Sequence, residues 1–349
     1  MHVAFGRTLT SGDFNHDGFA DLAVGAPLDS VGGVTLAGTV SILPGSAGGL
    51  TSVGGRLFTQ VGGAPEETDL FGDALAAGDF NNDGFADLAV GAPEEDVGNL
   101  VDPGAVSVLY GSTAGLTTVG GRLFTQVAGV PETDDTFGFA LAAGDFNHNG
   151  FADLAVGTPG EAVGSTDHAG TVSVVNGSAG GLTTVGGRLL TQVGGAVEPF
   201  DLFGVAVAAG DFNGNGVADL AVGANGEGVG SVSDAGAVSV LYGSASGLTT
   251  LGGRLFTQVG GAPEPQDRWG WPLAAGDFNG NGVADLAVGG PFEDVGSIVD
   301  AGAVSVLYGS ARGLISTGGR LFTKDSPGID GSASERDQFG QALTTGDTG

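Results

Sequence analysis

Apolar residues recur along the chain in short runs that turn-forming residues separate. In the stretch that begins at Phe71 these runs are FGDALAAGDF, FADLAVGAP, GAVSVLYGS and GRLFTQV, each bounded by Gly, Pro, Asn or Asp. Runs of this length, rich in Val, Leu, Phe and Tyr, are typical of β-strands. Helices are not expected, because no ten-residue window combines a 3.6-residue period with freedom from Gly and Pro. The pattern predicts an all-β protein.

The four runs return at a fixed interval, which an aromatic residue followed by Gly marks. These markers are Phe5, Phe71, Phe137, Phe203, Trp269 and Phe339. They stand 66 residues apart, except for a last step of 70 that contains the longer segment KDSPGIDGSASERDQ. We therefore expect repeats at residues 5–70, 71–136, 137–202, 203–268 and 269–338, with residues 339–349 as the start of a truncated sixth repeat.

Four strands in a unit of constant length predict one blade of a β-propeller, whose radial packing protects the sheet edges. We expect residues 1–349 to form a single propeller region of four-stranded antiparallel blades, with five complete blades and the first strand of a sixth. A solenoid is the alternative. It is disfavoured because a 66-residue repeat is very long for one coil of a β-helix.

An acidic loop follows the first run of every repeat, as in GDFNNDGFADLAVGAP. When its first Asp is numbered one, side-chain oxygens fall at positions one, three, five and nine, Gly stands at six, and position seven offers only its carbonyl. This alternation suits a hard cation, and the absence of His and Cys favours Ca²⁺ over zinc or copper. The predicted ligands at positions one, three, five, seven and nine are Asp13, Asn15, Asp17, Phe19 and Asp21; Asp79, Asn81, Asp83, Phe85 and Asp87; Asp145, Asn147, Asn149, Phe151 and Asp153; Asp211, Asn213, Asn215, Val217 and Asp219; and Asp277, Asn279, Asn281, Val283 and Asp285.

These loops predict about five Ca²⁺ sites with a structural role. An EF-hand is excluded, because that motif needs a Glu at position twelve and every loop has Val there. The alternative is a metal-free hairpin turn, which also uses Asp, Asn and Gly. Calcium is favoured because position nine keeps an oxygen that no turn requires. The last three loops carry Asn at position five, so they are expected to bind the ion more weakly.

The net charge of the chain limits the kinds of partner that it can bind. The chain has 40 acidic residues and 10 basic ones, for a formal charge of -30, which repels nucleic acid and anionic membranes. No apolar run is long enough to span a membrane, and the first residues, MHVAFGRTLTSGDF, do not resemble a signal peptide. We expect no nucleic-acid binding and no membrane insertion. Weak structural calcium sites predict an extracellular or cell-surface location, where calcium is abundant.

The Phe-Gly pair, the loop Asp-x-Asn-x-[Asp/Asn]-Gly-x-x-Asp and the Gly-Ala-Pro at residues 25–27 and 91–93 resemble the FG-GAP repeat. That repeat builds the β-propeller of integrin α-subunits and of many bacterial secreted or surface proteins. The resemblance implies that the loop joins the innermost strand of a blade to the second strand and that its oxygens bind calcium. Gly-Ala-Pro decays in the later repeats, and family propellers usually have seven blades. The near identity of the repeats resembles bacterial members.

No catalytic constellation is present in the sequence, so we expect a non-enzymatic module for adhesion or protein interaction, with a protein or glycan ligand at a surface. The alternatives are a carbohydrate-binding propeller and the accessory propeller of a secreted hydrolase whose catalytic domain is absent. Trp269 is expected to fill the Phe position of the core. The Arg of GGRLFT and an acidic residue after Gly-Ala-Pro recur together. They could form an ion pair that links neighbouring blades, or an exposed ion pair that contributes little to stability. The acidic residues are Asp29, Glu95, Glu161, Glu227 and Glu293.

Overall fold

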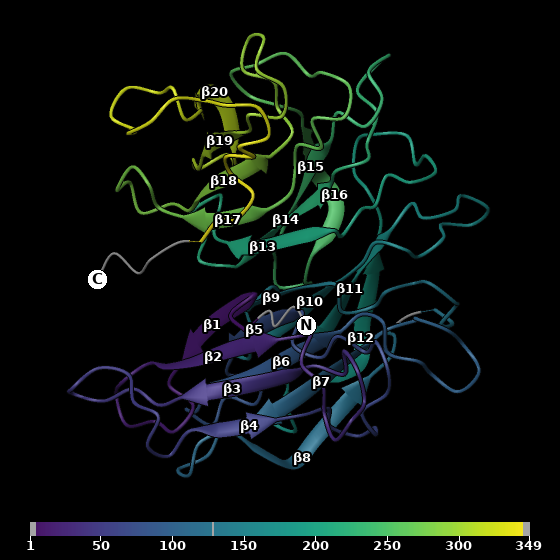
Figure 1. Cartoon of the computed structure of the whole chain (residues 1–349), viewed down its shortest axis with the longest axis vertical. Helices are drawn as coiled ribbons and strands as arrows, with labels where there is room; N and C mark the ends of the chain where they lie inside the picture. Colours follow the sequence, from purple (N-terminus) through teal and green to yellow (C-terminus); the bar gives the residue numbers. More distant parts are fainter. Residues whose placement is uncertain (1–4, 128, 345–349) are drawn as a thin grey trace. The chain divides into compact units, whose positions relative to one another are not determined.

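The computed structural model describes residues 5–127 and 129–344, which form strands joined by turns and loops (Figure 1). Twenty strands make five four-stranded sheets, and each sheet takes its strands in sequence order. The predicted all-β fold of antiparallel blades is confirmed. The described residues contain no helix, and therefore none that could cross a membrane.

Each sheet is built from a single repeat. The strands of the first are β1 (Thr8–Gly12), β2 (Asp21–Ala26), β3 (Thr39–Leu43) and β4 (Arg56–Phe58). Those of the second are β5 (Ala74–Gly78), β6 (Asp87–Ala92), β7 (Ala105–Tyr110) and β8 (Thr117–Phe124). The third has β9 (Ala140–Gly144), β10 (Asp153–Thr158), β11 (Thr171–Asn176) and β12 (Thr183–Leu190). The fourth has β13 (Ala206–Gly210), β14 (Asp219–Ala224), β15 (Ala237–Tyr242) and β16 (Thr249–Phe256). The fifth has β17 (Leu273–Gly276), β18 (Asp285–Gly290), β19 (Ala303–Tyr308) and β20 (Ile315–Phe322).

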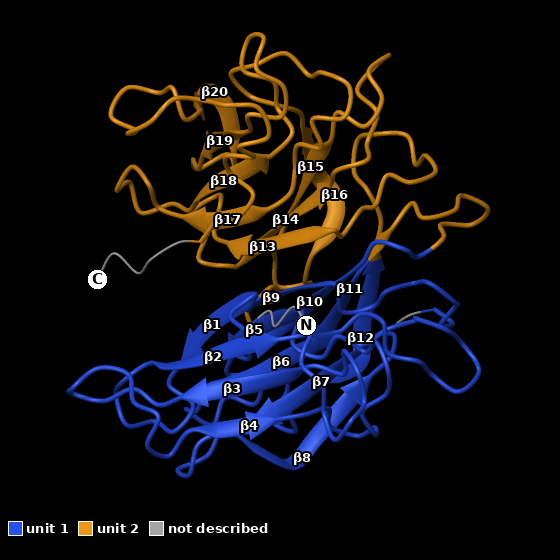
Figure 2. Cartoon of the chain, in the orientation of Figure 1, with its two compact units in different colours: residues 1–145, 150–161, 172–189 blue, residues 146–149, 162–171, 190–349 orange. Residues whose placement is uncertain are grey.

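The chain divides into two compact units (Figure 2). The first comprises residues 1–145, 150–161 and 172–189 and holds nearly all of the first three sheets. Within it, β5 lies between β1 and β9. The second comprises residues 146–149, 162–171 and 190–349, and in it β13 lies against β17. The single propeller region expected for residues 1–349 stays a prediction.

The core follows the second strand of each sheet, because both faces of that strand are covered. The strand DLAVGA is buried along its whole length in β6 and β14, and β10 and β18 are buried in the same way. Aromatic side chains fill the space between neighbouring sheets within a unit. Trp269 is 1% exposed at the position that Phe71 and Phe137 occupy in earlier repeats, which confirms the prediction for this residue.

The Phe-Gly marker is a point of close backbone approach between consecutive repeats. In the first unit the Phe137 amide donates to Pro103 O at 2.8 Å. The neighbouring Gly104 has φ +80°, and a Cβ placed on it would stand under 3.0 Å from the backbone of Phe137. Phe339 repeats the contact, because its amide donates to Ala301 O at 3.0 Å. Residues 339–344 hold no strand, and 345–349, where the sixth repeat would continue, lie outside the described residues.

Substitution of this glycine tests the close approach. Gly104→Ala is expected to lower the free energy of unfolding by about 2 to 5 kcal/mol, since the methyl group adds a backbone clash to the cost of a positive φ. Gly98→Ala is the matched control: Gly98 has φ +69° with nothing within 4 Å of a Cβ, so only the φ cost of about 1 to 2 kcal/mol applies. Urea denaturation measures both. Equal losses in the two variants would contradict the close approach.

Candidate metal centre

The acidic loops lie where the sequence places them, at the hairpin between the first and second strands of each sheet. In the first sheet Gly12 pairs with Asp21, so the eight residues between them form the turn. The same register joins Gly78 to Asp87 in the second sheet and recurs in the other three. Position nine is thus the first residue of the buried second strand.

The aspartate at position nine is buried in every repeat, and its carboxylate holds two separate turns. In the second repeat Asp87 Oδ2 accepts a hydrogen bond from the Phe80 amide at 3.0 Å, and Oδ1 accepts one from the Gly111 amide at 2.9 Å. Phe80 belongs to the acidic loop, whereas Gly111 follows the third strand of the sheet. The carboxylate therefore fixes the loop to the end of the third strand. The five equivalent residues, none more than 3% exposed, are Asp21, Asp87, Asp153, Asp219 and Asp285.

Burial changes the ionisation of these carboxyl groups. Desolvation raises the pKa of Asp87 and of Asp219 to about 7, and the backbone amides offset only part of that effect. Burial also raises the pKa of Asp21 and of Asp285 above its usual range. Neighbouring loop carboxylates raise it further, as Asp83 and Asp79 do for Asp87. A cation beside position nine would offset this buried negative charge.

Positions one and three converge on a single amide. In the first loop the Asp17 amide donates to Asp13 Oδ1 at 3.1 Å and to Asn15 Oδ1 at 2.9 Å, and Gly18 N donates to Asp13 Oδ2. The second and fourth loops repeat this arrangement. Two of the predicted oxygen ligands are therefore adjacent before any ion enters.

Position five lies at the exposed tip of the loop, whereas position seven ranges from exposed in Phe19 to buried in Val217. Asp17 Oδ1 accepts from the Phe19 amide at 3.0 Å, and Asn215 and Asn281 accept in the same way from Val217 and Val283. An Asn thus replaces Asp at position five without loss of this turn. In the fourth loop Asn213 Nδ2 donates to Asp219 Oδ2 at 2.9 Å, so position three contacts position nine. The position-seven carbonyl as a ligand stays a prediction.

The donor set fits Ca²⁺ in chemistry, because all of its side chains offer oxygen. The arrangement is that of a loop folded on its own amides. Among residues 5–127 and 129–344 no three acidic or histidine side chains gather closely enough to hold an ion. The structure brings together positions one and three, and in the fourth and fifth loops positions three and nine. It does not bring the three carboxylates of the first two loops into one group.

A second buried acidic cluster recurs between consecutive repeats, and the sequence pattern did not reveal it. In the first unit the buried carboxyl groups of Asp69 and Glu95 lie close enough to perturb each other, and Gln60 is also near Glu95. Asp69 is 0% exposed and Glu95 5%. The equivalent clusters are Gln126, Asp135 and Glu161; Gln192, Asp201 and Glu227; and Gln258, Asp267 and Glu293. The 66-residue recurrence of TQV, of an Asp and of the Glu was the available signal.

Two buried carboxyl groups this close together do not readily ionise at the same time, so the pair is expected to share a proton. Burial, followed by the charge of Asp69, raises the pKa of Glu95 to about 8, and Glu161 behaves likewise beside Asp135. Burial also raises the pKa of Asp69. Each cluster is therefore a buried carboxylic acid paired with a carboxylate near neutral pH.

Three of the five recurring arginines contact a main-chain carbonyl, and for these three the Arg–carboxylate bridge considered above does not form. Arg56 Nη1 donates to Leu116 O at 2.9 Å, and Arg122 Nη1 donates to Leu182 O at 3.0 Å. Arg254 contacts Leu314 O in the second unit. The guanidinium still links consecutive repeats, but through a main-chain carbonyl.

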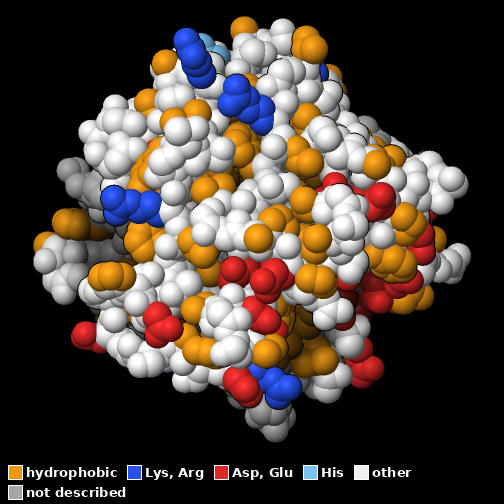
Figure 3. Space-filling model, turned by 90° about the horizontal axis from the view of Figure 1, so that it is seen from above, with side chains coloured by type: hydrophobic (Ala, Val, Ile, Leu, Met, Phe, Trp, Pro, Cys, Tyr) orange, Lys and Arg blue, Asp and Glu red, His pale blue; other side chains and the backbone are white. Residues whose placement is uncertain are grey.

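Acidic side chains gather in patches on the face shown in Figure 3, while Lys and Arg stand singly.

The shared proton predicts how pH changes stability. A folded-state pKa of about 8 for Glu95 exceeds that of an unfolded glutamate, so the folded chain holds a proton that the unfolded chain releases. Stability must then fall as pH rises from about 5 to about 8. Glu95→Gln should shrink that fall by about 1 to 3 kcal/mol.

Urea denaturation in chelator at several pH values measures the slope. Glu67→Gln is the control, since it removes one exposed acid near the same cluster and so the same unit of net charge. The Glu67 variant should keep the slope of the parent. If both variants flatten the slope alike, overall charge repulsion explains it and the shared proton does not.

Comparison with known proteins identifies the family of the repeats. The FG-GAP repeat model matches residues 5–43, 71–109, 137–175, 203–241 and 269–307, each from the Phe-Gly or Trp-Gly pair through the third strand. Phosphatidylinositol-glycan-specific phospholipase D from Bos taurus is 34% identical over 207 residues, which cover 58% of this chain and 24% of that protein. Integrin alpha-5 from Xenopus laevis is 32% identical over 233 residues, which cover 64% of this chain and 20% of that protein.

The chain spans no more than about a quarter of the length of these two relatives. Among solved structures, an Agrocybe aegerita lectin that recognises non-reducing terminal N-acetylglucosamine aligns with a TM-score of 0.47 at 12% identity, over 90% of this chain and 66% of the lectin. The five matched segments, their common spacing and their blade-like sheets lead to one assignment: this chain belongs to the FG-GAP repeat family.

Proposed function

We propose that the chain is a non-catalytic, calcium-stabilised extracellular propeller module for adhesion or protein interaction. The observation that carries this proposal is the buried aspartate at position nine, which five repeats place beside a loop of oxygen donors. In Asp21, Asp87, Asp219 and Asp285 the carboxylate is desolvated and is partly balanced by backbone amides, and the groups that perturb these four residues include no Lys or Arg. A divalent cation is the partner that this environment favours.

Calcium would be held by the oxygens at positions one, three, five and nine of each loop and by the carbonyl at seven. Bound there, the ion would supply positive charge to a hairpin that otherwise concentrates two or three carboxylates. The chain's own residues supply the rest, since Asp87 joins the loop to the turn at Gly111 and Asp79 orders the loop tip. Dissociation constants of about 10⁻⁴ to 10⁻³ M are typical of extracellular calcium modules. An affinity in that range would require the high calcium concentration found outside cells.

The proposal predicts a calcium-dependent melting temperature with a graded response to loop charge. Asp83→Asn should weaken calcium binding at the second loop by on the order of tenfold, because one carboxylate is lost. Stability in chelator should stay unchanged, since Asn fills the same turn in Asn215 and Asn281. The reverse change, Asn215→Asp, should strengthen binding at the fourth loop.

Calorimetric titration and thermal melting, with and without calcium, measure both effects. Asp87→Ala is an unsuitable reporter of calcium by itself, because it also removes two backbone hydrogen bonds and should destabilise the metal-free chain. The calcium role is contradicted if the parent chain melts at the same temperature across all calcium concentrations.

The interaction role is tested with beads that carry the folded chain, scored for adhesion to a panel of bacterial and animal cells. Loss of adhesion after protease treatment of the cells supports a protein partner, while loss after glycosidase treatment alone supports the carbohydrate-binding alternative. Beads that carry heat-unfolded chain are the control. Equal adhesion by folded and unfolded chain would oppose both.

A second candidate, the accessory propeller of a hydrolase, is favoured by the similarity to phosphatidylinositol-glycan-specific phospholipase D. The chain alone should then show no hydrolysis of phosphatidylinositol glycans, as the first candidate also requires. The two candidates separate at the level of the longer protein: a catalytic domain encoded next to these repeats supports the accessory role.

A further inference from the structure

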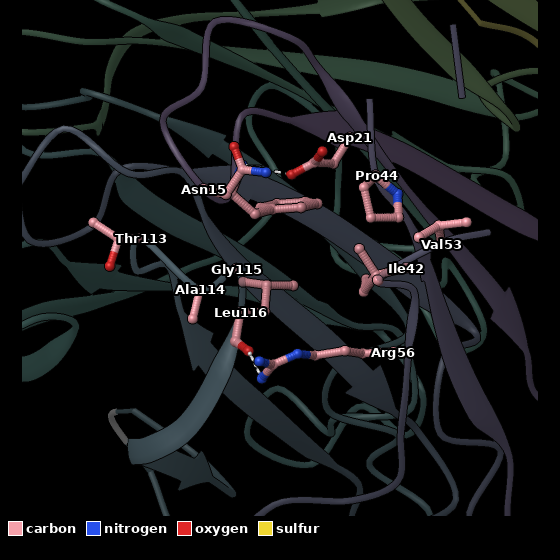
Figure 4. Close-up of a pocket in the computed structure, with 12 residues that line it drawn as sticks. Asn15, Asp21, Ile42, Pro44, Val53, Arg56, Thr113, Ala114, Gly115 and Leu116 are labelled. Atoms are coloured by element: carbon pink, nitrogen blue, oxygen red, sulfur yellow. Dashed lines mark hydrogen bonds between the residues drawn. The ribbon is translucent and has the colours of Figure 1, made fainter. Parts of the chain in front are cut away.

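A cavity of about 270 Å³ lies in the first unit between the first and second repeats (Figure 4). Ile42, Pro44 and Val53 line one side, and the segment from Thr113 to Leu116 lines the other. Asp21 borders it, and Arg56 reaches across it to donate to Leu116 O. The volume is slightly below the roughly 300 Å³ at which drug-sized ligand pockets begin, so the cavity suits a single small ring.

In the second repeat a tyrosine fills the equivalent space. Pro44 stands 66 residues before Tyr110, at the end of the third strand of its own sheet. The Tyr110 hydroxyl reaches the next repeat, where the Leu182 amide donates to it at 3.2 Å and Gly181 leaves room for it. Leu182 and Gly181 correspond to Leu116 and Gly115, which line the cavity.

The other residues around the cavity also have counterparts around Tyr110. Arg122 and Asp87 are charged groups that perturb the Tyr110 hydroxyl, and their counterparts 66 residues earlier, Arg56 and Asp21, line the cavity. A Cβ placed on Gly120 would lie 4.0 Å from the Tyr110 ring, and one placed on its counterpart Gly54 would lie 4.0 Å from the Pro44 ring. The cavity thus keeps the surroundings of a tyrosine side chain, while Pro44 is too short to fill them and carries no hydroxyl for the Leu116 amide.

The second unit repeats the filled arrangement. Tyr242 occupies the equivalent position in β15, and its hydroxyl lies against Gly313 of the following repeat. Arg254 and Asp219 flank Tyr242 as Arg122 and Asp87 flank Tyr110. Two repeats in separate units therefore show which group this environment accommodates, namely a neutral phenol with its hydroxyl turned toward the next repeat.

We propose that the cavity between the first and second repeats binds the phenol ring of a tyrosine side chain presented by a partner protein. The apolar side chains Ile42, Pro44 and Val53 would cover the ring, and the Leu116 amide would donate to its hydroxyl as Leu182 does to Tyr110. The proposal names a partner chemistry for the interaction role, and rests on that role only for the source of the tyrosine. Asn15 and Asp21, two of the predicted calcium ligands, also line the cavity, so binding is measured with and without calcium.

Binding of p-cresol, the tyrosine side-chain analogue, tests the proposal on the intact chain. The sequence contains four isoleucines, of which Ile42 lines the cavity, so methyl-labelled isoleucine gives a local NMR probe. The Ile42 signal should shift with a dissociation constant on the order of 1 mM, with and without calcium. Toluene, which lacks the hydroxyl, should bind at least several-fold more weakly.

Matched variants locate the site. Pro44→Tyr restores the residue type of the second repeat and should reduce p-cresol binding at least tenfold, whereas Pro44→Ala leaves the cavity empty and should retain it. Tyr110→Ala should create a second, equivalent site and raise the stoichiometry from one to two. The alanine variants keep the test valid if Pro44→Tyr does not fold.

Three results would overturn the proposal: no shift of Ile42 at saturating p-cresol, equal affinity for toluene, or a shift that Pro44→Tyr leaves unchanged. Binding of N-acetylglucosamine but not of p-cresol at Ile42 would also overturn it, in favour of a sugar site. The bead assay then separates this inference from the proposed function. If p-cresol binds but the beads do not adhere, the adhesion role fails and the phenol site stands.

Discussion

One buried carboxylate per repeat determines how each blade is assembled. At Asp87 two backbone amides from different turns meet on a single side chain, so the hairpin between β5 and β6 and the end of β7 take fixed positions relative to each other. A charge that is removed from water must be compensated, and two amides compensate it only in part, as the raised pKa of Asp87 shows. The same group that orders the blade therefore creates a demand for a proton or a cation.

This need to compensate negative charge recurs through the protein, because acidic side chains lie both in its interior and on its surface. The Asp69 and Glu95 pair meets it with a proton, because burial raises the pKa of both carboxyl groups and the charge of Asp69 raises that of Glu95 further. In the acidic loops the side chains at positions one and five are less buried than the carboxylate at position nine, so an ion could reach the loop from solvent. One repeat thus contains two solutions to buried negative charge. Calcium would act at the loop, whereas pH acts at both places, because the pKa of Asp87 is also raised to about 7.

The sequence was sufficient for whatever depends on local pattern. The 66-residue spacing predicted the repeats, the alternation of runs predicted four strands, and Asp-x-Asn-x-Asp-Gly predicted a hairpin whose ends pair as Gly12 and Asp21. It was insufficient where partners come from different repeats. Asp69 and Glu95 are 26 residues apart and belong to consecutive blades, and Arg56 meets a carbonyl 60 residues away. A regular Arg among regular acids suggested ion pairs, because charge pattern alone does not distinguish a carboxylate from a main-chain carbonyl.

Repetition also turns small departures into information about function. A side chain shared by several repeats is explained by the blade itself, as Tyr110 and Tyr242 are by their contacts with the next repeat. A departure at the same position removes a group for which the neighbouring blade has kept its space. Pro44 is such a departure, because the residues that would surround a tyrosine persist around an empty volume. In a protein whose repeats are nearly identical, specificity is therefore to be sought where one repeat lacks what its neighbours have, since the shared residues are already committed to packing.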